Sequence, residues 1–325
     1  MSSSTELLDE YYALLAEAGT GTDAGNGNGF RPLDTATISW NGSGSGSEET
    51  EKAISSSDTL VVVDMQHDFL PGGAFGVDEG DATIEGICDL IQKFHKAGAT
   101  VIATRDYHPK EHCSFTTHGG PFPPHCIMGT HGSLLHPRIA ETLQPLLQLA
   151  NDDTGGGGDD DDDSTNRNTH VVYKGFFAGV ESFGGFPYDT SNDEWKDRLS
   201  HVSEEAIEWS GAWALQASAI GSDANAPPDV MSLLKKKPCL DLLPKESDGR
   251  VFCCGLALDY CVLDTAVNFV QQTTSGPGAC FVVKDLTRAA RVPGLGCFGS
   301  GFLTDPNVLM EKLANNKIRM AQFVE

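Results

Sequence analysis

The chain has 325 residues, a length that suits one large domain or two small ones. Its 46 acidic and 22 basic residues give a formal net charge of −24, which argues against nucleic acid or an anionic membrane surface as a partner. No apolar run approaches the ~20 residues of a membrane helix, and the N-terminus lacks the features of a signal peptide. The nine cysteines are an odd and scattered set. We therefore expect an intracellular protein, most simply a cytoplasmic one.

The N-terminal part of the chain is acidic and rich in Gly, Ser and Asn, a composition that is typical of flexible segments. Within it, residues 4–18 have the apolar spacing of an amphipathic helix. We expect a largely flexible extension over residues 1–57, followed by one folded domain over residues 58–325.

Two insertions interrupt the predicted domain, at about 151–168 and 188–229. The first, NDDTGGGGDDDDDSTNRN, is of low complexity and predicts a solvated loop. The second has apolar residues at helical spacing between Trp195 and Trp213, which favours a helix packed on the core. A lid or an oligomer surface is the alternative, so a homo-oligomer stays open.

The remaining sequence alternates short β-branched apolar runs with amphipathic stretches. Such alternation predicts an α/β fold of three layers, in which helices cover both faces of a mostly parallel sheet. The predicted strands are 59–64, 99–105, 170–174, 250–255, 279–285 and 318–323. The predicted helices between them are 81–98, 138–150, 259–272 and 305–316.

Three reactive side chains follow predicted strands, where the carboxyl ends of parallel strands gather ligands and catalytic groups. Asp64 and Lys174 end two strands, and Cys261 stands where a strand leads into a helix. A packed core thiol is the alternative for any buried cysteine. A helix start, however, lowers the pKa of a thiol and offers N–H groups to an oxyanion. With a carboxylate to move the thiol proton and an ammonium to favour both anions, the three form a complete set for nucleophilic catalysis.

A second constellation has the composition of a metal site. Asp106 and His108 are two residues apart in TRDYHPKEHCSF, so they point the same way in an extended segment, and His125 follows a proline-rich loop. Two imidazoles and a carboxylate would leave coordination positions open for water or substrate. His112 is either a further ligand or a neighbour of one.

Six short blocks follow one another in a specific order along the folded part of the chain. Together they resemble the nicotinamidases of the isochorismatase-like cysteine hydrolase superfamily, over roughly 58–148, 169–187 and 248–325. The combination of D-x-H with a later H-C is the discriminating part, because most other members of the superfamily lack that metal site. The blocks are LVVVDMQHDFLPGG, TRDYHPKEHCSF, FPPHCIMGTHGSLLHP, VVYKGF, CGLALDYCVLDTA and VVKDLTRA.

The resemblance implies an isochorismatase-like hydrolase fold and the hydrolysis of nicotinamide to nicotinate and ammonia in NAD salvage, with pyrazinamide as a second substrate. It matches Asp64, Lys174 and Cys261 to the family's catalytic triad, which acts through a thioester. It matches Asp106, His108 and His125 to the ligands of a divalent metal that orients the pyridine ring. Zn²⁺ is usual in the family, with Mn²⁺ and Fe²⁺ as alternatives.

The resemblance also implies a substrate pocket. Leu256–Ala257 matches a cis peptide, and the N–H groups of Ala257 and Cys261 match the oxyanion hole. Phe122 stands where many members have a tryptophan, which shrinks the stacking area slightly. The residues expected to line the pocket are Gln66, Phe69, Phe122, Leu256 and Tyr260.

Two other functions remain open on the sequence. Another small-amide cysteine hydrolase of the same superfamily would act without metal, although the intact D-x-H…H set argues against it. A non-catalytic scaffold would use the acidic insertions to recruit partners, although an intact triad argues against that. The identity of the metal, the oligomeric state and the purpose of the insertions are not determined by the sequence.

Overall fold

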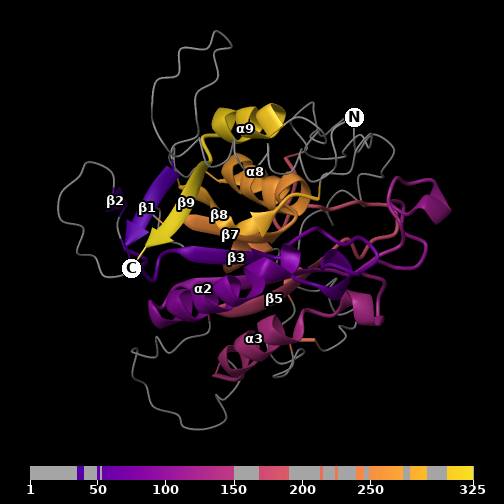
Figure 1. The fold of residues 1–325 in the computed structure, drawn as a ribbon, viewed down its shortest axis with the longest axis horizontal. Helices are drawn as coiled ribbons and strands as arrows, with labels where there is room; N and C mark the ends of the chain where they lie inside the picture. Colours follow the sequence, from indigo (N-terminus) through magenta and orange to yellow (C-terminus); the bar gives the residue numbers. More distant parts are fainter. Residues whose placement is uncertain are drawn as a thin grey trace.

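One continuous sheet runs through the computed structural model, with the strand order β2-β1-β9-β8-β7-β3-β4-β5-β6 (Figure 1). Every described strand pair is parallel except β5 with β6. The strands are β1 Thr35–Ser39, β2 Thr50–Glu51, β3 Thr59–Val63, β4 Thr100–Asp106, β5 Thr169–Lys174, β6 Trp213–Ala214, β7 Val251–Leu256, β8 Cys280–Arg288 and β9 Arg319–Val324. The structure describes residues 35–39, 50–51, 53–149, 168–189, 213–214, 224–225, 239–244, 249–273, 279–290 and 306–324.

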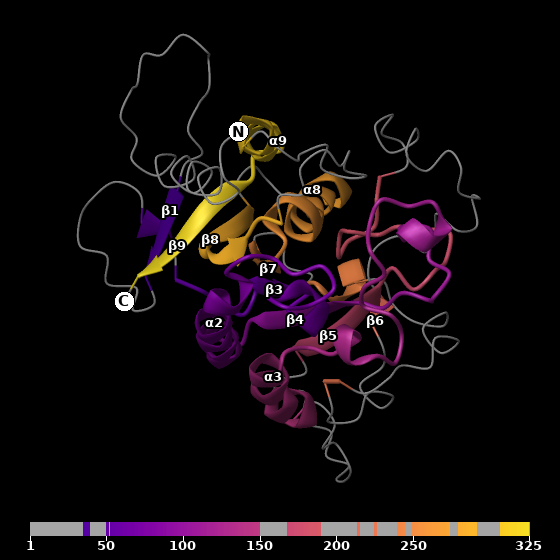
Figure 2. The same ribbon diagram turned by 45° about the vertical axis from the view of Figure 1, so that its right-hand side comes forward.

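Four longer helices cover the sheet, α2 and α3 on one face and α8 and α9 on the other (Figures 1 and 2). This arrangement confirms the predicted three-layer α/β fold. Within the described residues, no helix is long and apolar enough to cross a membrane. The helices are α2 Ile84–Lys96, α3 Pro137–Leu149, α8 Leu263–Gln272 and α9 Pro306–Asn315, with short helical turns η1 His67–Phe69, η2 Gly80–Thr83, η3 Thr116–His118, η4 His131–Ser133, η5 Cys239–Leu242 and η6 Leu258–Val262.

The core forms because the central strands are apolar on both faces. All residues of β3, β4 and β7 are buried, as expected for strands that are covered by helices on both sides. Helix α2 presents Ile87, Ile91 and Phe94 to this core at helical spacing, and the chain turns after it at Gly98, which has a φ of +75°. The Phe252 ring stacks on Phe281 at 4.9 Å between ring centroids. Aromatic and β-branched packing thus binds neighbouring strands into one core.

The N-terminal extension differs from its prediction. Residues 35–39 form β1, which pairs in parallel over its whole length with residues 320–324 of β9, and Ala36 and Ile38 are fully buried. The expectation of flexibility is therefore wrong for this segment, because backbone pairing and two buried apolar side chains offset its ordering entropy. The helix predicted over residues 4–18 lies outside the described residues.

The second insertion also differs where it is described. Trp213–Ala214 forms β6, which pairs antiparallel with β5, so this end of the predicted helical stripe is extended. The edge of β5 offers unpaired backbone groups that a passing segment can satisfy. Farther along, Asn225 Oδ1 accepts a hydrogen bond from the Leu135 N–H at 2.7 Å. Residues 195–209 of the predicted helix lie outside the described residues.

Four strands of the sheet end at the same edge, and their ends carry the predicted reactive residues. The chain leaves β3 toward β4 and β5, and later returns to the other side of β3 as β7, which creates a switch point at the carboxyl ends of the strands. Asp64 follows β3, and Asp106 lies opposite Lys174 in the β4–β5 register. Ala257 follows β7 directly.

Gly255 shows how tightly this edge is built. A Cβ at Gly255 would lie 2.1 Å from the Val63 carbonyl oxygen, and the residue has a φ of +102°. We expect Gly255→Ala to lower the free energy of unfolding by about 1–3 kcal/mol or more, because one strained backbone position alone costs that much. Chemical denaturation measures this loss. The control is Gly179→Ala, whose Cβ would meet no atom within 4 Å. Equal stability of the two variants would contradict the packing described here.

The acidic first insertion follows α3 in the sequence and precedes β5, whose start lies at the edge of the sheet opposite the reactive residues. Asn168 belongs to the fold, since its carbonyl accepts from the Val101 N–H and its side chain donates to Gly98. We therefore expect that replacing residues 151–167 by a short Gly/Ser connection changes the turnover rate by no more than about twofold. Steady-state kinetics measures the rate, and a collapse would mean that the acidic segment takes part in the site.

Candidate active site

The three predicted catalytic side chains meet at the carboxyl ends of β3 and β5 and at the start of α8. The Lys174 Nζ lies 2.8 Å from the Asp64 Oδ2 and donates a hydrogen bond to the Cys261 Sγ at 3.5 Å. Asp64 and Lys174 are fully buried, and Cys261 is 4 % exposed. Lys174 therefore joins a carboxylate and a thiol in a space that contains little water.

Asp64 is held in one orientation by β4. The Asp64 Oδ1 accepts a hydrogen bond from the Thr104 hydroxyl at 2.6 Å, and the Asp64 N–H donates to the same hydroxyl oxygen at 3.1 Å. Asp64 itself has a φ of +47°, in the left-handed region that aspartate adopts more readily than most residues. These contacts turn the second oxygen of Asp64 toward Lys174. Sequence reasoning missed Thr104, because a buried threonine in a strand looks like a packing residue.

Burial sets the ionisation of this cluster. Burial raises the pKa of Asp64 to about 6, against the opposing effect of the Lys174 ammonium. For Lys174, burial acts to lower the pKa, but Asp106 and Asp64 outweigh it and the pKa is raised. At neutral pH the lysine is therefore charged and the Asp64 carboxyl is mostly ionised, which is the form that can accept a proton.

The pKa of the Cys261 thiol differs from the prediction. Burial raises the pKa of Cys261 well above its ordinary value; Lys174 opposes this effect, and Asp64 and Asp106 add to it. The expectation of a thiol with a lowered pKa is therefore wrong for the protein without substrate, because burial and two carboxylates act against the helix start. The thiol keeps its proton until a base removes it during attack.

The backbone around Cys261 has the form that the sequence blocks implied. The Leu256–Ala257 peptide is cis, and Cys261 lies in the π-helical turn η6 that leads into α8. The Ala257 carbonyl accepts hydrogen bonds from the N–H groups of Tyr260 and Val262, which fixes the turn. Ala257 and Cys261 both line the aromatic pocket described below.

Asp106, His108 and His125 also come together, and their ligand atoms all lie within 4.8 Å of one another. The Asp106 Oδ2 lies 3.4 Å from the His108 Nε2 and 4.0 Å from the His125 Nε2. The other oxygen of Asp106 accepts a hydrogen bond from Lys174. One carboxylate thus links the candidate metal ligands to the candidate catalytic residues.

The orientation of the two imidazoles suits a metal. The Nδ1 of His108 lies 2.8 Å from the Gly175 carbonyl and that of His125 lies 2.7 Å from the Pro123 carbonyl, so both Nδ1 atoms donate and both Nε2 atoms face the Asp106 carboxylate. Burial acts to lower the pKa of His108, but the Asp106 carboxylate acts in the opposite direction and the pKa is raised. Within the described residues, the buried His108 Nε2 has no hydrogen-bond partner. Burial, with a contribution from His108, lowers the pKa of His125 to about 4 and keeps that ring neutral. Two nitrogens and one carboxylate are a fitting donor set for Zn²⁺ with open positions.

His112 does not offer a ligand atom. Its Nδ1 lies 2.7 Å from the Ser114 hydroxyl and its Nε2 lies 3.1 Å from the Val180 carbonyl. Burial lowers the pKa of His112 to about 2, so the ring is neutral. It packs against His108 with 4.1 Å between ring centroids. The structure therefore makes His112 a neighbour that supports the His108 ring.

A narrow aromatic pocket connects Cys261 with the candidate metal ligands. Three of the residues predicted to line it do so, namely Phe69, Phe122 and Tyr260, and Ala257, which was predicted for the oxyanion hole, lines it as well. Sequence reasoning missed Phe75 and Phe183, which also line it. Both lie in loops beside glycines, where no periodicity marks a residue as facing a site. The rings meet edge-on, as Phe122 does with Tyr260 at 5.9 Å between ring centroids.

Two residues predicted to line the pocket do not. The Gln66 side chain donates to the carbonyls of Asp106 and Ser133 and accepts from the Asp106 N–H, all at 2.7–2.8 Å, which engages its amide nitrogen and oxygen. Gln66 therefore holds the backbone of a metal ligand and does not face the substrate. The Leu256 side chain lies against Gly80. Both predictions are corrected, because each side chain is turned into the fold.

Comparison with known proteins finds similarity to one protein family and to several related sequences. Residues 58–145 match the family described as the Isochorismatase domain. The nicotinamidase of Escherichia coli strain K12 is 38 % identical over 93 residues, which are 24 % of this chain and 44 % of that protein. The chain thus spans less than half the length of this relative. The nicotinamidase of Saccharomyces cerevisiae is 24 % identical over 238 residues, which are 66 % of this chain and 81 % of that protein.

Among solved structures, the yeast nicotinamidase Pnc1p bound to the inhibitor nicotinaldehyde has a TM-score of 0.49 and 21 % identity, over 82 % of this chain and 99 % of that one. The pyrazinamidase of Pyrococcus horikoshii in complex with zinc has a TM-score of 0.47 and 23 % identity, over 82 % and 99 %. The chain is therefore similar to the Isochorismatase domain over residues 58–145 and, in its related sequences, to the nicotinamidases.

Proposed function

We propose that the protein is a nicotinamidase, a cysteine hydrolase that converts nicotinamide and water to nicotinate and ammonia. The observation that carries this proposal is one narrow aromatic pocket with the Cys261 thiol, Asp106 and His125 on its walls, and with His108 beside the other two candidate metal ligands. A flat ring between the aromatic side chains would place a carboxamide at the thiol and a ring nitrogen at the imidazoles. The similarity to nicotinamidases from several species supports the same activity.

In the first half of the reaction, the Cys261 sulfur attacks the carboxamide carbon while Asp64 takes the thiol proton. A base with a pKa of about 6 is ionised at neutral pH and lies close to the sulfur, which suits this transfer. The C–S bond forms and the carbonyl oxygen becomes an oxyanion, which the N–H groups of Ala257 and Cys261 stabilise. Lys174 remains charged and offsets the negative charge that develops around it.

In the second half, Asp64 gives its proton to the departing nitrogen, the C–N bond breaks, and ammonia leaves a thioester on Cys261. Asp64 then takes a proton from a water molecule, which adds to the thioester carbon. The C–S bond breaks, nicotinate is released, and the thiol regains the proton. A divalent metal held by Asp106, His108 and His125 would supply a Lewis-acid contact that orients the pyridine nitrogen. Zn²⁺ fits the donor set; Fe²⁺ is also bound by two imidazoles and one carboxylate, and Mn²⁺ and Fe²⁺ would bind more weakly than Zn²⁺ by the general order of affinities.

We also propose that residues 58–325, together with β1, form one hydrolase domain that acts in the cytoplasm in NAD salvage. The buried pairing of β1 with β9 supports the enlarged domain. The cysteines that the structure describes are free thiols, which favours a reducing compartment. Pyrazinamide, which keeps both the carboxamide and a ring nitrogen, would be a second substrate.

The experiment that tests the function is ammonia release from the purified full chain, with nicotinamide compared against a panel of small amides. We expect a kcat/KM for nicotinamide well above that for aliphatic and carbocyclic amides. Similar rates for all amides would favour a general amidase of the superfamily. No ammonia from any amide, in protein that holds its metal, would favour the non-catalytic alternative.

A further inference from the structure

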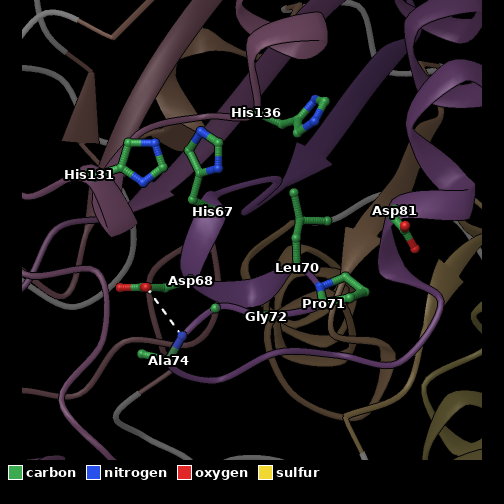
Figure 3. A pocket seen from close by; sticks show the side chains of 10 residues that line it. His67, Asp68, Leu70, Pro71, Gly72, Ala74, Asp81, His131 and His136 are labelled. Carbon is green, nitrogen blue, oxygen red and sulfur yellow. Dashed lines mark hydrogen bonds between the residues drawn. The ribbon is translucent and has the colours of Figure 1, made fainter.

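A second cavity opens on the outer side of the loop that follows β3 (Figure 3). It measures about 460 Å³ and shares no lining residue with the aromatic pocket. Three imidazoles line it, those of His67, His131 and His136, together with the carboxylates of Asp68 and Asp81. Among the residues that the structure describes, no lysine, arginine or cysteine lines this cavity. Nothing in the proposed amide hydrolysis uses these side chains.

The His67 ring lies within reach of the other two. It lies between them, with 4.0 Å between its ring centroid and that of His131 and 5.9 Å to that of His136 (Figure 3). At Zn–N distances of about 2.0–2.1 Å, two imidazoles on one zinc have ring centroids no more than ~6.5 Å apart. Both separations from His67 fall below this limit, and a shared ion would require the partly exposed rings of His131 and His136 to turn toward His67.

The ring nitrogens are available to a ligand. Within the described residues, neither the His67 ring nor the His131 ring has a hydrogen-bond partner, and His136 uses only its Nδ1, which accepts from the Arg138 N–H at 3.3 Å. Burial, and then the neighbouring His131 and His136, lower the pKa of His67. The pKa of His136 is also lowered, first by burial. Neutral imidazoles carry the lone pairs that bind metals. This differs from His112, whose two nitrogens are both engaged.

The charge around the cavity selects a cation. Asp68 contributes a carboxylate that is held in place by the N–H groups of Cys126 at 2.7 Å and Ala74 at 3.3 Å, and Asp81 is exposed at the rim. Two carboxylates beside neutral imidazoles disfavour an anion and stabilise a divalent ion. We propose that this cavity is a second metal site, in which His67, His131 and His136 bind one divalent transition-metal ion of the Zn²⁺ class. Nitrogen and oxygen donors without sulfur suit Zn²⁺, Ni²⁺ and Cu²⁺.

The test is the zinc stoichiometry of the full chain in competition with a chromophoric chelator. We expect two Zn²⁺ per chain in the unaltered protein and one in the double variant His131→Ala/His136→Ala, whose ammonia release from nicotinamide stays unchanged. In the single variant His131→Ala, the affinity of the second site for Zn²⁺ should fall by at least about tenfold. Even the loss of a residue that only hydrogen-bonds to a metal ligand changes metal affinity by that much. The matched control is His118→Ala, an exposed histidine outside both sites.

Several outcomes would overturn the second site. One Zn²⁺ per chain in the unaltered protein, or two in the double variant, would do so. Binding of inorganic phosphate that the double variant loses would instead identify protonated imidazoles and an anion site. Because His131 is exposed, its single variant keeps the test open if the double variant does not fold. Stoichiometry does not depend on the reaction, so a failure of the nicotinamidase proposal would leave this test unaffected.

Discussion

Replacement of Cys261 by alanine is expected to lower kcat for nicotinamide by about 10⁶-fold, the scale of loss when the nucleophile of an acyl-transferring triad is removed. The reason is local, because the Cys261 sulfur is the one thiol among the described residues that contacts Lys174 and lies on the wall of the aromatic pocket. The fold should survive, since a thiol that is 4 % exposed at the pocket wall is replaced by a smaller apolar group. Ammonia release and far-ultraviolet circular dichroism measure the two effects.

The same variant tests the covalent step. Acid quenching of unaltered protein during turnover should trap the thioester, which intact mass spectrometry detects as one added nicotinoyl group, and the Cys261→Ala protein should show none. The matched control is Cys280→Ala, which also removes a buried thiol. The Cys280 thiol donates to the carbonyl of Ala266 in α8 and does not line the aromatic pocket. That variant should lose stability at most. Substantial turnover or an acyl adduct in Cys261→Ala would refute the mechanism.

The fold was predictable from the sequence because its signals are local and consistent. Continuous apolar runs such as residues 59–63 and 251–256 mark strands that are buried on both faces, and amphipathic stretches between them mark the helices. The rule that parallel strands end at one edge then brings Asp64, Lys174 and Asp106 together without any knowledge of contacts. The resemblance to a known family added the cis peptide at Ala257, which no local pattern marks.

Other features depend on contacts that the sequence does not display. Gln66 looks like a polar pocket residue, but its carboxamide pairs with the backbone of Asp106 and Ser133. The pKa of Cys261 depends on the burial of the sulfur and on the charges around it. The position at a helix start predicted a lowered pKa, whereas the pKa is raised. Phe75 and Phe183 reach the pocket from loops whose course is set by tertiary packing. Sequence periodicity therefore located the edge of the site but not the orientation of each side chain.

The other large effect concerns the candidate metal ligands. We expect His125→Ala to lower the zinc content of the protein at the active site, because it removes one of two imidazoles that face the Asp106 carboxylate. Even partners outside the ligand set change metal affinity by about 10–100-fold, so a direct ligand should cost at least that much. Elemental analysis measures the zinc content independently of activity. The matched control is His112→Asn, because His112 is buried beside His108 but has both nitrogens engaged. Equal loss of zinc in both variants would mean that His112 also ligates the metal.

The substrate itself tests what this site recognises. Benzamide has nearly the shape of nicotinamide and the same carboxamide, but it has no ring nitrogen to meet the metal that Asp106, His108 and His125 would hold. A site that is built around a polar contact rejects an analogue lacking it by about 10⁴-fold, whereas a pocket senses a missing methylene by only about 10²-fold. We therefore expect kcat/KM for benzamide to be lower than that for nicotinamide by ~10⁴, while pyrazinamide stays a substrate. In His125→Ala, most of the activity on nicotinamide and much of this preference should disappear together, since both depend on the same contact. Equal turnover of benzamide and nicotinamide by unaltered, zinc-loaded protein would show that the aromatic pocket alone selects the ring, and a general amidase would then be the better assignment.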